Sequence, residues 1–389
     1  MTKSEQSGRS AKNGLSKLQE KPIRVLQFIG SLNLGGSQSM IMNLYRSIDR
    51  EKIQFDFVID RKNETFFKKE IESYGGRVFV FDEYFKGINY YRYCRQWEEF
   101  FKGHPEYRIV HCHVRSVASI VLKIAKRNGL KTICHSHSIS NGKGVKSVVK
   151  KYLQRGIVEY SDSLLACSED AAIWLFGKNA AQSKKCDIIH NAIDPERYRF
   201  DKEVRFVIRQ QLGVADDAVL VGHIGRFVDV KNHKFMVKLA EDLDDSKIQF
   251  VFCGEGKMKK EIINESKGKR ISFYNDYKKA NELYNAMDLF VLPSKYEGLG
   301  MVLLEAQFNG LPCLASIAVP KSTMISDSIE YLPLDSEVWC KKISTFSPRR
   351  KSGQKLLSQA DNYKIEHEVA KVEQLYNELY GANYDNGEE

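Results

Sequence analysis

Short apolar runs alternate with amphipathic segments along most of the chain. Residues 23–29 (IRVLQFI) are typical of a buried strand, and a glycine-rich loop then leads into residues 40–48 (MIMNLYRSI), which have helical periodicity. Helix-like segments such as 117–128 separate five further strand-like runs, at 53–59, 76–81, 107–113, 130–136 and 162–168. The alternation predicts a parallel sheet with helices on both faces and with functional loops at the carboxyl ends of its strands.

A second alternating set follows a segment that has little strand pattern. Residues 191–217 contain Pro195 and a short basic helix candidate at 205–212, so we expect a domain boundary there. Beyond it, strands are predicted at 218–225, 247–254, 270–275, 288–294 and 311–316, and helices at 233–242, 280–287 and 300–309. Near the end of the chain an apolar stripe predicts an amphipathic helix that carries Ile365, Val369, Val372, Tyr376 and Leu379.

The length of 389 residues fits two α/β domains of ordinary size. We expect a disordered tail at 1–21, an N-terminal Rossmann-like domain at 22–195, a second Rossmann-like domain at 196–350 and a helical segment at 351–389. The tail is polar and has no apolar run, so it is neither a signal peptide nor a membrane anchor. No later stretch reaches the roughly 18 apolar residues that a spanning helix needs.

Composition and cysteine usage favour a soluble protein of the cytoplasm. With 42% hydrophobic and 28% charged residues, the chain can bury a core. The cysteines are scattered and form no C-x-x-C pair, which indicates neither a zinc site nor a disulfide framework. There are eight of them: Cys94, Cys112, Cys134, Cys167, Cys186, Cys253, Cys313 and Cys340.

A net charge of +10 favours an anionic partner, such as a nucleotide phosphate or an acidic membrane surface. Residues 143–157 would form a basic amphipathic helix able to lie on anionic lipids. A solvated helix over the core explains the same pattern equally well. The basic positions of this segment are Lys143, Lys146, Lys150, Lys151 and Arg155. The chain contains no nucleic-acid-binding motif.

The glycine loop after the first strand holds Gly30, Gly35 and Gly36, where backbone N–H groups can approach a phosphate or sugar closely. The spacing is not G-x-G-x-x-G, and only Asp60 is placed to bind a ribose at the end of the second strand. A nicotinamide-dependent dehydrogenase is therefore disfavoured. The alternative is a turn and helix cap without a ligand.

Two further groups of residues lie at predicted strand ends in the second half. Arg226 and Lys231 follow the strand at 218–225 and precede a helix, where two cations and a helix N-terminus can hold a diphosphate. Glu297 precedes a glycine loop and Glu305 lies in the helix after it, so that both carboxylates can accept hydrogen bonds from sugar hydroxyls. The backbone N–H groups near this helix start can bind phosphate, and they belong to Gly298, Leu299, Gly300 and Met301.

The ordered motifs GSLNLGGSQ, CHSHS, SLLACSE, IIHNAID, HIGRFVDVKNH, FCGEG and PSKYEGLGMVLLEA resemble those of the retaining glycosyltransferases of family four. The resemblance extends from Ile23 to about Ala315. It implies an α/β fold of the GT-B type, in which two Rossmann-like domains face each other across a cleft. Residues 22–195 would then face the acceptor, residues 196–350 would bind the nucleotide-sugar, and the final helix would cross back onto the first domain.

The resemblance also implies roles for particular residues. Arg226 and Lys231 would bind the donor diphosphate, Glu305 the ribose and Glu297 the transferred sugar. Gly35 and Gly36 would approach the donor from the other domain. A histidine after the strand at 130–134 would contact the sugar near the reacting carbon, and both His135 and His137 are candidates; His113 and Asn191 are weaker ones.

The implied reaction is retaining transfer, in which the two cations stabilise the departing diphosphate. We expect no bound cofactor and no metal, because the D-x-D of Asp242 and Asp244 falls at a helix end. UDP is the default nucleotide. The motifs look like those of bacterial enzymes that build capsular polysaccharide or exopolysaccharide on a lipid carrier, which indicates a lipid-linked saccharide acceptor and a cytoplasmic enzyme with possible peripheral contact with the membrane.

Aromatic residues in the segment 84–101 can touch such an acceptor, although their helical spacing favours core packing. They are Tyr90, Tyr91, Trp97, Phe100 and Phe101. Two other functions remain open: a UDP-sugar epimerase of the same architecture, and a non-catalytic relative that binds sugar nucleotides.

Overall fold

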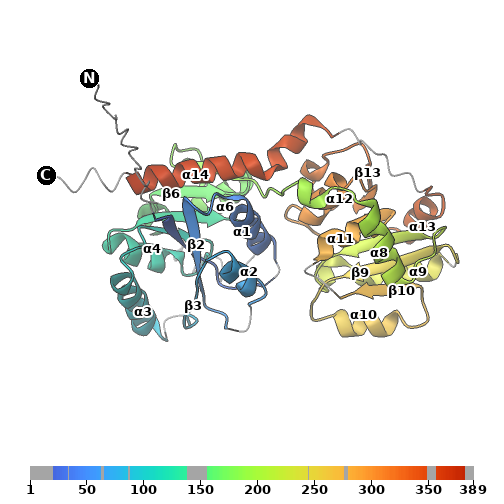
Figure 1. Cartoon of the computed structure of the whole chain (residues 1–389), viewed down its shortest axis with the longest axis horizontal. Coiled ribbons are helices and arrows are strands. Elements are labelled where there is room, and N and C mark those ends of the chain that lie inside the picture. The colour runs from blue at the N-terminus through green and yellow to red at the C-terminus, as the bar shows by residue number, and fades with distance from the viewer. Residues whose placement is uncertain are drawn as a thin grey trace, which may run out of the picture.

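The computed structural model describes residues 21–33, 35–62, 65–85, 88–137, 156–243, 245–275, 279–347 and 356–381. These residues form two α/β lobes, each built around a parallel sheet (Figure 1). Of the predicted tail at 1–21, residues 1–20 lie outside the described residues, and so does most of the basic segment at 143–157.

Within the described residues, the first lobe contains a seven-stranded parallel sheet in the order β3-β2-β1-β4-β5-β6-β7. Its strands are β1 (Ile23–Phe28), β2 (Ile53–Ile59), β3 (Val78–Val80), β4 (Ile109–Cys112), β5 (Lys131–Ser136), β6 (Ser163–Ala166) and β7 (Cys186–Ile188). Its helices are α1 (Gly36–Ser47), α2 (Lys68–Ser73), α3 (Tyr90–Gly103), α4 (Ala118–Arg127), α6 (Glu169–Phe176) and α7 (Lys178–Ala181).

The second lobe has a six-stranded parallel sheet in the order β10-β9-β8-β11-β12-β13, counted over the described part of the chain. Its strands are β8 (Val219–Ile224), β9 (Ile248–Cys253), β10 (Ile271–Tyr274), β11 (Leu289–Leu292), β12 (Cys313–Ser316) and β13 (Ile329–Leu332). Its helices are α8 (Lys202–Leu212), α9 (His233–Asp242), α10 (Lys259–Glu265), α11 (Ala280–Ala286), α12 (Met301–Phe308) and α13 (Ser336–Ser344). Short 3₁₀ turns are η1 (Glu196–Tyr198), η2 (Asp229–Lys231), η4 (Lys321–Thr323) and η5 (Ser358–Tyr363).

The predicted parallel sheets and their α/β alternation are confirmed. The expected helix at 205–212 begins earlier, at Lys202, because the Asp201 side chain accepts hydrogen bonds from the N–H groups of Glu203 and Val204 and so caps the helix. Two strands, β7 and β13, have no counterpart in the sequence pattern. They are short and only partly buried at the two sheet edges.

The last helix, α14 (Ile365–Gly381), lies along the first lobe (Figure 1). The apolar stripe expected from the sequence enters the core between α1 and the first sheet, where Ile365, Val369, Val372 and Tyr376 are buried. The opposite face of the sheet is covered by α3, α4 and α6. The chain therefore begins and ends its folded part in one lobe, with the second lobe inserted between.

A buried carboxylate joins four strands of the first sheet at their amino-terminal ends. Asp56 in β2 receives two bonds of 2.6 Å from the Arg24 guanidinium in β1 and one of 2.7 Å from the Tyr107 hydroxyl before β4. The Arg77 side chain, just before β3, adds bonds of 3.0 and 3.2 Å. Burial alone would raise the pKa of Asp56, but these hydrogen bonds outweigh it and hold the pKa below its usual value.

We predict that Asp56→Asn lowers the free energy of unfolding by about 3–5 kcal/mol at pH 7, because it leaves two arginines around a neutral group. The folded-state pKa is depressed, so the stabilisation is complete above the pKa of the unfolded chain and is lost as the pH falls through the folded value. The difference between wild type and variant in urea unfolding should therefore shrink below about pH 4. Glu99→Gln, which removes an exposed pair with Arg95, is the control and should change nothing measurable. Equal losses in both variants would contradict the assignment.

Candidate functional site

The loops after β8 and β9 lie against each other through their backbones. The N–H of Gly225 donates to the carbonyl of Cys253 at 2.9 Å, and the N–H of Phe227 donates to the carbonyl of Glu255 at 2.9 Å. A Cβ placed on Gly254 would lie 2.0 Å from the carbonyl oxygen of Gly225. Only glycine permits this approach, which accounts for the F-C-G-E-G motif. The backbone of Arg226 is fixed because the residues on either side of it, Gly225 and Phe227, both donate to the loop after β9.

The two predicted cations lie at the carboxyl end of β8, in different states. The Arg226 side chain is exposed and makes no hydrogen bond or ion pair with any described residue. Lys231, in η2, lies 2.5 Å from Glu297, from its Nζ to Oε1, and the two side chains are 17% and 9% exposed. The structure therefore brings Lys231 and Glu297 together and leaves Arg226 available to an anion.

Glu297 is held from a second direction. The Ser294 hydroxyl, just after β11, donates to the same Oε1 at 2.6 Å. Because β8 and β11 are neighbours in the sheet, their carboxyl ends meet, and the contact between Lys231 and Glu297 follows from this topology. A carboxylate that is already oriented by a lysine and a serine can accept sugar hydroxyls without reorganising.

Glu305 lies in the second turn of α12 and is partly buried. The Tyr284 hydroxyl of α11 donates to its Oε2 at 2.7 Å. Burial raises the pKa of Glu305 above its usual value, although the Tyr284 hydrogen bond and the charges of Arg197 and Arg46 act in the opposite direction. Arg46 belongs to α1 of the first lobe, so Glu305 lies on the side of the second lobe that faces the first.

Two helices in this region begin without a side-chain cap. Within the described residues, neither α9 nor α12 has a side-chain hydrogen bond at its cap position, Asn232 and Gly300 respectively, and both cap residues have left-handed backbone. Free N–H groups at a helix start attract anions. A Cβ on Gly298 would meet no atom within 4 Å, so packing does not require glycine there. Close approach of a ligand to the backbone would explain why this position is a glycine.

The glycines of the first lobe give the same result. Gly35 is the cap residue of α1, and Gly36 is its first residue. A Cβ on Gly36 would meet nothing within 4 Å, and one on Gly35 would meet only the flexible end of Gln38. Packing within the protein therefore does not require these two glycines. A phosphate or sugar that approaches the backbone closely would require them, because a Cβ would occupy the space between.

The structure distinguishes between the two histidine candidates. His135 lies within β5 and is fully buried. His137 follows the last residue of that strand and is partly exposed. Its Nε2 lies 2.8 Å from Nδ1 of His113, and its Nδ1 has no partner among the described residues. His137 is therefore the better placed of the two to meet a ligand, with His113 behind it. Asn191 is buried, and its side-chain oxygen has no partner within the described segments.

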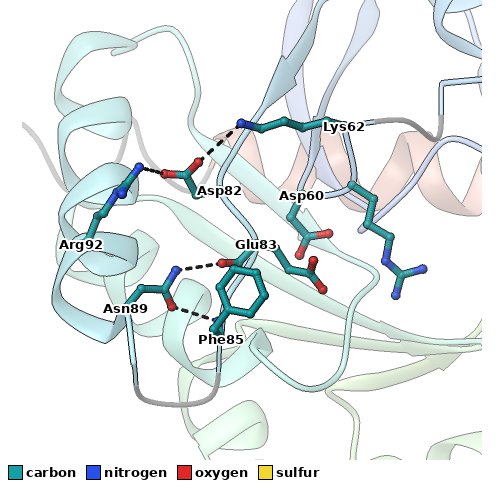
Figure 2. Close-up of a pocket in the computed structure, with 8 residues that line it drawn as sticks. Asp60, Lys62, Asp82, Glu83, Phe85, Asn89 and Arg92 are labelled. Carbon is teal, nitrogen blue, oxygen red and sulfur yellow. Dashed lines mark hydrogen bonds and ion pairs between the residues drawn. The ribbon is translucent and has the colours of Figure 1, made fainter.

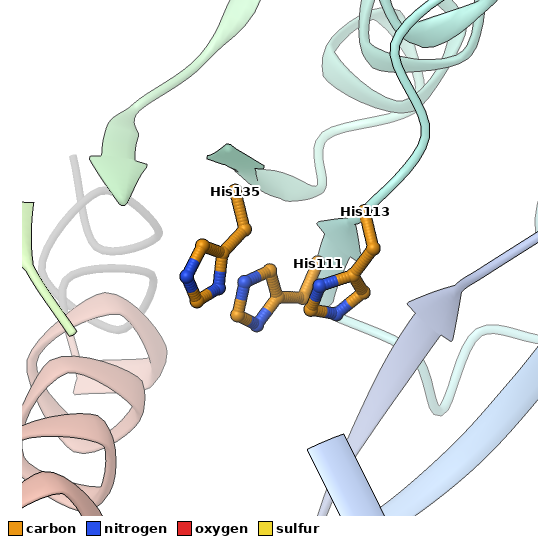
Figure 3. A group of neighbouring side chains, drawn as sticks. All are labelled: His111, His113 and His135. Carbon is orange, nitrogen blue, oxygen red and sulfur yellow. The ribbon is translucent and has the colours of Figure 1, made fainter. Parts of the chain in front are cut away.

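Three histidines, His111, His113 and His135, offer nitrogen atoms within 4.8 Å of one another, a spacing that a shared metal ion would require (Figure 3). Tetrahedral zinc with Zn–N bonds of about 2.0–2.1 Å would hold its ligand nitrogens about 3.4 Å apart. Here the rings of His111 and His135 are stacked, with centroids 5.3 Å apart and planes within 8°. Both nitrogens of His113 are already hydrogen-bonded. The arrangement fits a polar stack better than a metal centre.

A pocket of about 610 Å³ lies where β2 and β3 end, beside the glycine loop (Figure 2). The N–H of Asp60 donates to the carbonyl of Gly30 at 3.2 Å, which joins the pocket to that loop. Arg92 and Lys62 both pair with Asp82, and the Asn89 amide holds the backbone at Glu83 and Phe85. The lining residues are Asp60, Arg61, Lys62, Asp82, Glu83, Phe85, Asn89 and Arg92.

The aromatic segment divides between core and surface. Trp97 and Phe101 of α3 are buried and Phe100 packs against them, as core packing predicts. Tyr91 is 87% exposed, and Phe85 and Ile88 beside it are 57% and 89% exposed. The exposed apolar residues lie directly next to the pocket, and we call Phe85, Ile88, Tyr90 and Tyr91 the apolar rim.

Several residues of the site carry no signal in the sequence. Ser294 and Tyr284 orient the two glutamates, and Gln27 and Tyr376 contact the histidines. Ser294 lies within the motif PSKYEGLGMVLLEA, but the pattern indicates no role for it, and no motif marks the other three. Only their position at a strand end or on a helical stripe could have drawn attention to them. Asp242 ends α9, as expected, and Asp244 lies outside the described residues.

Two family models match the chain. Residues 34–197 match the model described as Glycosyltransferase Family 4, and residues 204–327 match Glycosyl transferases group 1. EpsF of Bacillus subtilis (strain 168), which is named as a glycosyltransferase, is 31% identical over 372 residues, 91% of this chain and 96% of that protein. The chain belongs to glycosyltransferase family 4.

Solved structures show the fold of this glycosyltransferase. HepE of Anabaena, determined in complex with UDP and glucose, is 17% identical and superimposes with a TM-score of 0.74 over 91% of this chain and 99% of that one. The expected GT-B fold is confirmed, with two Rossmann-like sheets. A further relative is the UDP-Gal:alpha-D-GlcNAc-diphosphoundecaprenol alpha-1,3-galactosyltransferase of Escherichia coli, 26% identical over 230 residues, 54% of this chain and 58% of that enzyme.

The eight cysteines of the glycosyltransferase all lie in the described part of the chain, where no disulfide joins them. Among its described helices, none combines the length and the apolar character needed to cross a bilayer.

Proposed function

We propose that the enzyme transfers a hexose or N-acetylhexosamine, with retention, from a UDP-sugar to a lipid-linked saccharide during synthesis of a capsular polysaccharide or exopolysaccharide. The observation that carries the proposal is the Lys231–Glu297 pair, which lies with Arg226 at the ends of the neighbouring strands β8 and β11, next to the uncapped starts of α9 and α12. Glu305 follows in the second turn of α12. Support comes from relatives named for O-antigen synthesis and for transfer from UDP-Gal to a diphosphoundecaprenol acceptor.

In this proposal each residue keeps the role that the family resemblance implies. Arg226 and Lys231 bind the diphosphate, and the backbone from Gly298 to Met301 supplies N–H donors to it. Glu305 accepts the ribose hydroxyls, and Glu297 those of the sugar. Gly35 and Gly36 of the first lobe let that lobe approach the donor.

The chemistry is a substitution at the anomeric carbon. The bond from this carbon to the diphosphate oxygen breaks, and a bond to the acceptor hydroxyl oxygen forms on the same face. The hydroxyl proton passes to the departing diphosphate oxygen, so no protein nucleophile is needed. The cations stabilise the charge that develops on the diphosphate, and in this proposal they take the place of a metal ion.

Nucleotide selectivity gives the first test. A ligand that binds only the native protein stabilises it by about 2.7 kcal/mol at 100 times its dissociation constant. We expect UDP to raise the melting temperature by several degrees and GDP and NAD to have no effect. A shift with GDP alone would keep the reaction class and change the donor. A shift with NAD alone would contradict the proposal.

The roles of the charged residues give the second test. Lys231→Ala and Glu305→Ala should each weaken UDP binding at least tenfold in isothermal titration, about 1.4 kcal/mol, and should abolish most sugar transfer. The matched control is Lys234→Ala. Lys234 lies three residues further along, and its carboxylate partners are on α10. Wild-type binding in folded Lys231→Ala protein would remove Lys231 from the site.

For the acceptor we propose the pocket at the ends of β2 and β3 together with the apolar rim. Carboxylates such as Glu83 can accept saccharide hydroxyls, and exposed aromatic rings can cover the apolar face of a sugar or contact the lipid. The pocket adjoins the glycine loop that approaches the donor in this proposal.

The acceptor assignment predicts a selective change in kinetics. Phe85→Ala should raise KM for a lipid-linked acceptor about tenfold and leave KM for the UDP-sugar unchanged. Phe206→Ala is the control, because Phe206 is also 57% exposed but lies on α8 of the second lobe. If the two variants behave alike in the transfer assay, the acceptor binds elsewhere.

We propose a cytoplasmic location with peripheral contact at the membrane, because the acceptor is lipid-linked and the chain is basic. An epimerase of the same architecture is the second candidate. Product analysis separates the two, because an epimerase returns a UDP-sugar whereas a transferase releases UDP. A non-catalytic relative would yield neither product.

A further inference from the structure

A polar stripe crosses the face of the first sheet that α14 covers. Gln27 in β1 pairs in register with His111 in β4, and the rings of His113, His135 and His137 continue the stripe as neighbours of one another. The surrounding side chains on this face are apolar, from Val25 and Ile109 to Val372. Polar groups buried here are costly unless their hydrogen bonds are made, so their arrangement is informative.

Hydrogen bonds join this stripe to the last helix. Tyr376 of α14 lies with its hydroxyl 2.7 Å from Nδ1 of His111 and 3.1 Å from Nε2 of Gln27. The Gln27 Oε1 lies 2.7 Å from Nε2 of His113. The Nδ1 of His113 lies 2.8 Å from Nε2 of His137. A continuous path thus leads from Tyr376 through Gln27 and His113 to His137.

Burial determines the charge state of these rings. It lowers the pKa of His111 and of His137 to about 3, and it lowers the pKa of His113 and His135 well below the usual value. At neutral pH each ring therefore carries one N–H and one lone pair. When neutral rings are hydrogen-bonded in a row, each bond needs one donor and one acceptor nitrogen. The tautomer of the first ring therefore determines the tautomer of every ring after it.

The direction of the path follows from the amide of Gln27. As the structure orients it, its Nε2 donates to Tyr376, and its Oε1 can only accept. His113 must then donate from Nε2, which leaves its Nδ1 as an acceptor. His137 must donate to that atom from its own Nε2. The Nδ1 of His137 is left with a lone pair; this atom is buried, although the residue is partly exposed, and it has no partner among the described residues.

We propose that Tyr376 and Gln27 are positioning residues which, through His113, hold His137 in the Nε2–H tautomer, so that its Nδ1 accepts a hydrogen bond from a hydroxyl of the donor sugar. The inference rests on the proposed function, and it assigns to His137 the sugar contact that the family resemblance implies for a histidine after this strand, because His135 is buried within β5. A hydroxyl that donates to nitrogen becomes richer in electrons, which favours the cation-like anomeric carbon of the transition state. The other tautomer would present an N–H and withdraw electron density from the sugar.

The tautomers can be measured without any substrate. In protein labelled with ¹⁵N-histidine, long-range ¹H–¹⁵N correlation separates protonated from unprotonated ring nitrogens. The His137 signals are assigned by their loss in His137→Gln. We expect a neutral Nε2–H ring for His113 and His137 in the wild type. Gln27→Leu should give His137 a mixture of tautomers, because no acceptor then fixes His113.

The controls use a matched pair of buried tyrosines. Tyr376→Phe should also release the tautomer, because the Gln27 amide loses the hydroxyl that orients it. Tyr45→Phe removes a hydroxyl from an equally buried tyrosine of the same core, whose partner is Gln54 rather than the stripe, and should leave the His137 signals unchanged. If Gln27→Leu does not fold, Tyr376→Phe gives the same test.

An unchanged His137 tautomer in both Gln27→Leu and Tyr376→Phe overturns the inference, whatever the enzyme transfers. A changed tautomer with kcat reduced about tenfold and KM for the UDP-sugar unchanged supports it fully. A changed tautomer with unaltered kcat overturns the contact between His137 and the sugar, which belongs to the proposed function, while the path itself stands. Bound zinc that alters the ring signals would overturn the path in favour of a metal centre.

Discussion

The packing of α14 on the first sheet is the constraint on which the first lobe depends. A central parallel sheet must bury both faces, and here α3, α4 and α6 cover one while α1 and α14 cover the other. Without α14 the apolar residues near Val25 and the four histidines would face water. The helix therefore completes a core that the first two hundred residues cannot close, and it places a tyrosine hydroxyl where a buried polar stripe requires a partner.

In the second lobe, the two cations of the proposed diphosphate site are held in different ways. Lys231 is neutralised by Glu297 in a partly buried pair, whereas Arg226 is solvated. On binding a diphosphate, Lys231 would exchange Glu297 for the phosphate oxygens, and Arg226 would only lose its hydrating water. Such an arrangement needs little reorganisation, and preorganised charge is the main way in which proteins stabilise developing charge.

Much of the fold could be predicted, because apolar runs of four to seven residues are the direct sign of strands buried on both faces. β7 and β13 were not predicted, because these edge strands contain polar residues such as Asp187 and Glu330 and so lack an apolar run. In the site, Lys231 and Glu297 follow motifs, but their mutual contact depends on β8 and β11 being neighbours. The link between Gln27 and Tyr376 spans 349 residues, and nothing local in the sequence marks either end of it.

The long return of the chain to its starting lobe has a consequence for biosynthesis. β7 ends at Ile188 and α14 begins at Ile365, so the ribosome must synthesise the whole second lobe before it synthesises the helix that covers the first sheet. At roughly 5–20 residues per second this takes on the order of ten to thirty seconds, during which one face of the nascent sheet is open. Chaperone demand should therefore peak in the middle of translation, and premature termination before α14 is complete would release a polypeptide whose first lobe exposes apolar surface.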